Sequence, residues 1–220
     1  MPELRQPCEI RAESIRRLLL AWWRCNRRDF PWRRTRDPYK VAVAELMLRR
    51  TRAEVVERVY REFVRRWPDP RALSQARAGA IVATLRPLGL RWRARNIVSI
   101  ARILRAVPDP GAVFRQPETL AGLPGVGEYV SAAVASFALG RAVPVVDTNT
   151  ARIASRILGL QGRREWRRSR AVRELLVGIV RGSAARGINL ALLDLAALVC
   201  LPHAPRCREC PISRHCRTGR

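Results

Sequence analysis

Helical patterning runs through almost the whole of this 220-residue chain. Apolar residues recur at the spacing of amphipathic helices, and no alternating strand pattern extends beyond a few residues. Turn and cap residues punctuate the pattern; Asp37 and Pro38, for example, supply an N-cap and a first-turn proline. We therefore expect an all-α protein. The predicted helices cover residues 10–24, 38–50, 52–66, 71–86, 92–106, 117–122, 128–139, 148–158, 167–181 and 188–199.

The charge of the chain favours a polyanionic partner. The formal net charge is +25, and Lys40 is the only lysine, so arginine supplies nearly all of the positive charge. Nucleic acid is the favoured partner and an anionic membrane surface the second, while an arginine-rich genome or thermophily is the alternative explanation. The early apolar run at residues 18–23 is too short to span a membrane, and the N-terminus lacks a signal peptide. We expect a cytoplasmic, nucleoid-associated protein.

Residues 123–147 combine a tight glycine-rich turn with a single carboxylate. Leu-Pro-Gly-Val-Gly precedes a helix of small residues, and Asp147 follows an apolar run. Such a turn between two short helices directs backbone N–H groups outward, where they suit a phosphate oxygen. Gly125, Val126 and Gly127 are therefore the predicted contacts to a nucleic-acid backbone, with Asp147 as an acid near the bound strand.

Four of the six cysteines lie close together near the C-terminus, with the spacing C-x6-C-x2-C-x5-C. This crowding favours an intracellular metal site over a disulfide framework. Four thiolates can ligate zinc or a [4Fe–4S] cluster; structural zinc sites usually have two separated C-x2-C pairs, so the spacing favours iron–sulfur. Arg206 and Arg208 inside the loop are candidate phosphate contacts, or simply solvated side chains. The proposed ligands are Cys200, Cys207, Cys210 and Cys216.

The hairpin, the aspartate and the cysteine spacing, in this order, resemble the helix–hairpin–helix DNA glycosylases of the endonuclease III and MutY superfamily. The resemblance covers about residues 10–216, and residues 27–39 and 45–51 look closest to the Mig-type thymine mismatch glycosylases. It implies two helical domains. A six-helix barrel over 29–141 would carry the hairpin, and a [4Fe–4S] cluster domain would combine 1–28 with 142–220. The target base would be flipped into the cleft between them.

The resemblance also implies catalytic roles for Asp147, Tyr129 and Glu45. Asp147 would stabilise the positive charge that develops on the sugar and orient or deprotonate water; its alternative role is a helix N-cap. Tyr129 stands where bifunctional members carry a Schiff-base lysine, which a phenol cannot replace, so strand cleavage should be absent or weak. Its alternative role is packing. Glu45 would line the base pocket and share a proton with the leaving base, or pair with Arg49.

Arg49, Arg50 and Leu90 match the family region that fills the space left by the flipped base, although Leu90 also reads as an ordinary loop leucine. Asn189 and Asp194 are interpreted as structural. The expected function is a monomeric, monofunctional glycosylase that removes thymine or uracil opposite guanine from double-stranded DNA. One alternative is removal of adenine opposite guanine or 8-oxoguanine, although the sequence ends at the cysteines, without the further domain of MutY proteins. The other is a non-catalytic DNA-binding module.

Overall fold

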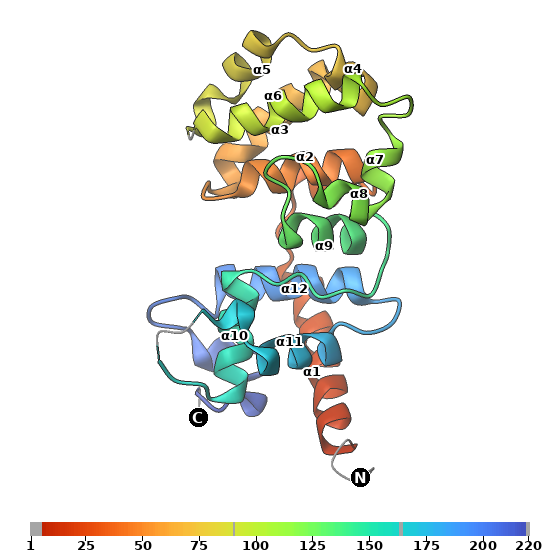
Figure 1. Ribbon diagram of the computed structural model, residues 1–220. Helices are drawn as coiled ribbons and strands as arrows, with labels where there is room; N and C mark the ends of the chain where they lie inside the picture. The colour runs from red at the N-terminus through yellow and green to blue at the C-terminus, as the bar shows by residue number, and fades with distance from the viewer. Residues whose placement is uncertain (1–5, 90, 163–164, 219–220) are drawn as a thin grey trace. The chain divides into compact units, whose positions relative to one another are not determined.

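The computed structural model describes residues 6–89, 91–162 and 165–218, and these residues form helices and loops without a strand (Figure 1). The predicted all-α class is confirmed. The chain divides into two compact units: unit 1 combines Met1–Arg28 with Gly140–Arg220, and unit 2 is Asp29–Leu139. The second boundary lies two residues before the predicted one. None of the described helices is long and apolar enough to cross a membrane.

Unit 2 is built around α2 (Pro38–Leu48), a helix that is buried on nearly every side. The carboxylate of Asp37 accepts hydrogen bonds from the N–H groups of Tyr39 and Lys40 at 2.9 and 3.3 Å, which confirms the predicted cap. In Figure 1, α2 lies in the middle of this unit, between α6 and α9. The other helices are α3 (Ala53–Arg66), α4 (Pro70–Ser74), α5 (Ala78–Leu85), α6 (Arg91–Arg105), α7 (Ala112–Arg115), α8 (Pro117–Ala121) and α9 (Glu128–Phe137).

Two features of unit 2 depart from the prediction. The single helix expected over 71–86 is interrupted: α4 ends at Ser74, and Arg77 has extended backbone before α5 begins. The guanidinium of Arg105 in α6 donates to the Ser74 carbonyl at 3.0 Å, so a tertiary contact replaces a bond that a continuous helix would make. Helix α7 was not predicted, because four residues are too few to establish a helical period.

Unit 1 joins residues from both ends of the chain in one hydrophobic core. Its helices are α1 (Gln6–Asn26), α10 (Thr148–Leu158), α11 (Arg170–Ile179) and α12 (Ala185–Leu198). The core side chains come from all four helices and include Leu19, Ile153, Leu176 and Leu195. Buried Asp194 accepts hydrogen bonds from the Trp23 indole at 2.8 Å and from the Arg28 guanidinium at 2.6 Å. These bonds fasten the end of α1 to α12, which is a structural role for Asp194.

Candidate active site and cysteine loop

The predicted hairpin joins α8 to α9 in unit 2. Gly125 has a φ of +79°, and a Cβ there would lie 2.2 Å from the Asn96 side-chain nitrogen, so only glycine fits. The N–H of Val126 donates to the carbonyl of Leu123 at 3.0 Å and is therefore used inside the turn. Of the three predicted phosphate contacts, this geometry favours the N–H groups of Gly125 and Gly127, beside the N-terminus of α9.

Glu45 and Tyr129 meet in unit 2. Glu45 lies on α2 and is only 4% exposed, while Tyr129 lies in the first turn of α9 and is half-buried. The Tyr129 hydroxyl donates to Glu45 Oε2 at 2.9 Å. The hairpin helix thus brings a phenol to a buried carboxylate, and the Tyr129 side chain has a polar contact in addition to any packing role.

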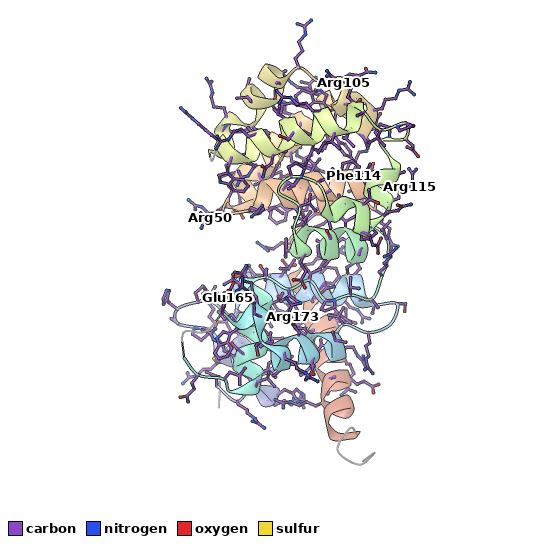
Figure 2. All side chains as sticks on the ribbon, in the orientation of Figure 1. Arg50, Arg105, Phe114, Arg115, Glu165 and Arg173 are labelled. Carbon is purple, nitrogen blue, oxygen red and sulfur yellow. The ribbon has the colours of Figure 1, made fainter. Side chains whose placement is uncertain are left out.

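The turn after α2 carries the two arginines predicted to contact DNA. Arg49 donates to the carbonyl of Gly125 at 2.9 Å, and its guanidinium lies over the Trp92 ring, 4.8 Å from the centroid. Arg50 has a φ of +57° and an exposed side chain on the outside of this turn (Figure 2). The turn therefore presents Arg50 to solvent and ties Arg49 to the hairpin. Leu90 lies outside the described residues.

Asp147, in unit 1, caps α10. Its Oδ1 accepts hydrogen bonds from the N–H groups of Asn149 and Thr150 at 2.9 and 2.7 Å, and the Thr150 hydroxyl accepts the N–H of Asp147 in a capping box. The segment that leads to Asp147 is fixed by Asn189, whose side-chain amide bonds the Val145 N–H and the Val143 carbonyl at 3.0 and 2.9 Å. The N-cap role considered for Asp147 is therefore present, and it fixes the direction of the carboxylate.

A chain of hydrogen bonds connects Asp147 to the cysteine loop within unit 1. Asn149 Nδ2 donates to Asp147 Oδ2 at 2.8 Å, Arg152 donates to Asn149 Oδ1 at 3.0 Å, and Arg152 also donates to the Cys200 carbonyl at 2.9 Å. Neither Asn149 nor Arg152 was predicted from the sequence. Their i, i+3 spacing, directly after the aspartate on a capped helix, was the available signal.

The four cysteines of the loop line one small cavity of about 30 Å³. Burial, together with the charges of the three neighbouring sulfurs, raises the pKa of the Cys210 thiol to about 11. Arg156 donates to the sulfur of Cys200 at 3.2 Å. Over the described residues, no three His, Cys, Asp or Glu side chains converge closely enough to hold a single metal ion. The four thiols nevertheless line one common cavity, and four thiolates are a ligand set that suits zinc or a [4Fe–4S] cluster.

The loop also positions its two candidate phosphate contacts. Arg206 and Arg208 are both exposed. Arg206 forms an ion pair with Glu209 at 3.8 Å, which reduces the charge that it can offer to a phosphate.

Comparison with known proteins identifies the family. A model of the HhH-GPD superfamily of base excision DNA repair proteins matches residues 43–178, a range that contains the hairpin and Asp147. The chain belongs to this superfamily. Its cysteine loop lies beyond the matched range. The assignment of this loop as a metal site therefore rests on the spacing and the geometry of the four cysteines.

Relatives of this HhH-GPD protein align over nearly its full length. A thymine-DNA glycosylase of Aeropyrum pernix is 36% identical, with 94% of each chain covered. A thymine/uracil-DNA glycosylase of Methanothermobacter thermautotrophicus is 34% identical, with 90% of each chain covered. The solved structure of a thermostable thymine-DNA glycosylase superposes with a TM-score of 0.82 at 31% identity, covering 95% of this chain and 96% of the other. The helix–hairpin–helix glycosylase resemblance is confirmed.

Proposed function

We propose that this HhH-GPD protein is a monofunctional DNA N-glycosylase that removes thymine or uracil mispaired with guanine and leaves an abasic site. The observation that carries the proposal is the hydrogen-bonded pair of Tyr129 and Glu45 beside the hairpin. The thymine and thymine/uracil specificities of the two relatives support the choice of base.

Asp147 is the proposed catalytic carboxylate. Cleavage of the N-glycosidic bond develops positive charge on the deoxyribose, and a fixed carboxylate stabilises that charge electrostatically. The bonds from the backbone of α10 hold Oδ1, while Oδ2 accepts its bond from the Asn149 side chain. The same carboxylate can orient the water that attacks the sugar and accept its proton.

Glu45 and Tyr129 are the proposed contacts to the departing base. A pyrimidine leaves more readily when its developing negative charge receives a hydrogen bond or a proton. The Tyr129 hydroxyl orients the Glu45 carboxyl group by donating to one of its oxygens. Neither side chain can form a Schiff base, and Lys40, the only lysine, forms an ion pair with Asp37 at 3.7 Å. The strand should therefore stay intact after base removal.

The proposed cofactor is a [4Fe–4S] cluster on Cys200, Cys207, Cys210 and Cys216. The bound cluster would offset part of the negative charge of the four thiolates and crosslink the loop that displays Arg206 and Arg208. Protein purified without oxygen should be brown and contain iron and sulfide in equal amounts, and Cys210→Ser should lower both. Colourless protein that contains stoichiometric zinc would contradict this assignment.

Four duplexes test the proposed activity: one with a G·T pair, one with G·U, one with adenine opposite 8-oxoguanine, and a matched G·C control. Each is incubated with enzyme and then divided, with alkali added to one half. We expect breaks only after alkali, at the thymine or uracil. Breakage only at adenine would assign the adenine activity instead, and an absence of breaks in every duplex would favour a DNA-binding module. Scission without alkali would contradict monofunctional chemistry.

A further inference from the structure

Arg93, near the start of α6, is a buried cation. Its side chain is 1% exposed. No carboxylate pairs with it in the described part of the chain, and its Nε has no hydrogen-bond partner there. Burial lowers the pKa of Arg93, and the nearby charge of Arg49 lowers it further. Burying a guanidinium without a carboxylate is unfavourable. Charge neutralisation therefore does not explain the position of Arg93, and its hydrogen bonds are the feature to consider.

Those contacts fasten two turns. Of the two terminal nitrogens of the guanidinium, Nη1 donates to the Leu88 carbonyl at 3.3 Å. The other donates to the Arg49 carbonyl and to the Thr51 hydroxyl, the latter at 3.0 Å. Each accepting carbonyl directly precedes a residue with left-handed backbone: Arg50 follows Arg49, and Gly89 follows Leu88. Arg50 is a non-glycine residue in this conformation, which persists only where the surroundings hold it.

The neighbours of Arg93 on α6 contact a third segment. Trp92 stacks against the guanidinium of Arg49, which itself donates to the carbonyl of Gly125. The Asn96 side chain fills the space beside Gly125 in the hairpin. The first two turns of α6 therefore support three segments of unit 2: residues 49–52, residues 86–89 and the hairpin at 123–127.

We propose that Arg93 is a positioning residue that sets mismatch specificity by holding the 49–52 turn at a fixed distance from the hairpin. With the hairpin on the DNA backbone, this turn presents Arg50 to the mismatched pair, and Arg93 keeps its left-handed conformation in place. The inference rests on the proposed function, since it assumes that the turn and the hairpin contact mismatched DNA.

The test compares Arg93→Met with Arg102→Met, a control that removes an exposed positive charge from the same helix. Fluorescence anisotropy at one salt concentration gives the Kd for a G·T duplex and for a matched G·C duplex, and single-turnover kinetics give the rate of base release. Because small misplacements of positioned groups are costly, Arg93→Met should reduce the G·T over G·C preference by about 10- to 100-fold. The control should keep the preference. An unchanged preference in folded Arg93→Met would overturn the proposal.

Arg93→Lys keeps the charge but cannot hold both turns, so it provides the measurement if Arg93→Met does not fold. Asparagine tolerates left-handed backbone, so a turn with Arg50→Asn needs less support from Arg93. In that background, adding Arg93→Lys should change the G·T over G·C preference by no more than about twofold. A full-sized loss in the Arg50→Asn background would show that Arg93 does not act through the turn.

The binding and release measurements separate the two proposals. If the wild-type protein prefers the G·T duplex but releases no base, the glycosylase proposal fails. The binding preference of the Arg93 variants then still tests whether Arg93 sets mismatch specificity. If the wild-type protein releases the base and the Arg93 variants keep the wild-type preference, only the Arg93 proposal fails.

Discussion

Replacing Asp147 with asparagine should abolish base release and leave α10 capped. Oδ1 of Asp147 accepts two backbone N–H bonds at the start of this helix, and asparagine offers an equivalent oxygen. Asparagine and aspartate are comparable N-caps, whereas alanine in their place costs about 0.5–2 kcal/mol. Asp147→Ala should therefore lower the melting temperature by about 2–4 °C for each kcal/mol lost in a chain of this length, and Asp147→Asn should change it little.

The rate of base release should depend on the negative charge of Asp147 and not on its role as a helix cap. Removing one electrostatic contact to a transition state typically reduces the rate 100- to 1000-fold, or about 2.7–4 kcal/mol. Both Asp147 variants should show at least this loss in single-turnover release from a G·T duplex, measured after alkali. Duplex affinity, measured by anisotropy, should stay close to that of the wild-type protein. If Asp147→Asn releases thymine at the wild-type rate while Asp147→Ala is merely less stable, then Asp147 is only a helix cap.

Three further substitutions test other parts of the structure. Tyr129→Phe removes the donor to Glu45, and we expect about tenfold slower base release with unchanged duplex affinity; an unaltered rate would exclude the pair from the chemistry. Asn189→Leu removes both bonds that hold the segment before Asp147, so thermal denaturation should show a loss of about 1–3 kcal/mol together with slower release. Burial raises the pKa of Tyr60 to about 12 in the folded protein. The unfolded chain loses this proton near pH 10, so the free energy of unfolding should fall as the pH rises from 10 to 12. Tyr60→Phe should show a smaller fall than the wild-type protein over that interval, and equal falls would contradict the assignment.

Local signals in the sequence predicted most of the fold. Asp37 before Pro38 set the start of α2, and the glycines at 125 and 127 indicated the hairpin. The prediction failed where a distant side chain decided the outcome. Arg105 lies 31 positions from Ser74, whose carbonyl it binds at the end of α4, and no local pattern announces that bond. Arg93 was not predicted either, because its partners at residues 49 and 51 are distant in the sequence and it looks like any other arginine of a basic helix.

The catalytic candidates divided in the same way. The spacing and the family resemblance nominated Asp147, Tyr129 and Glu45 individually, because each falls at a recognisable position in a motif. The contacts that orient them come from residues without such a signal. Asn189, which fixes the segment before Asp147, lies on α12, 44 positions away from Val145. Orientation therefore required the structure, whereas residue type and spacing were sufficient to nominate the chemistry.

The division of the chain into two units has a consequence for how the protein is made. During synthesis, all of unit 2 leaves the ribosome before α12, and domains generally fold as units in the order in which they emerge. The Trp23 indole can donate to Asp194 only after the 171 residues up to Asp194 have been synthesised. The first helix is thus translated early and buried late, and its apolar face needs protection until the last helix arrives.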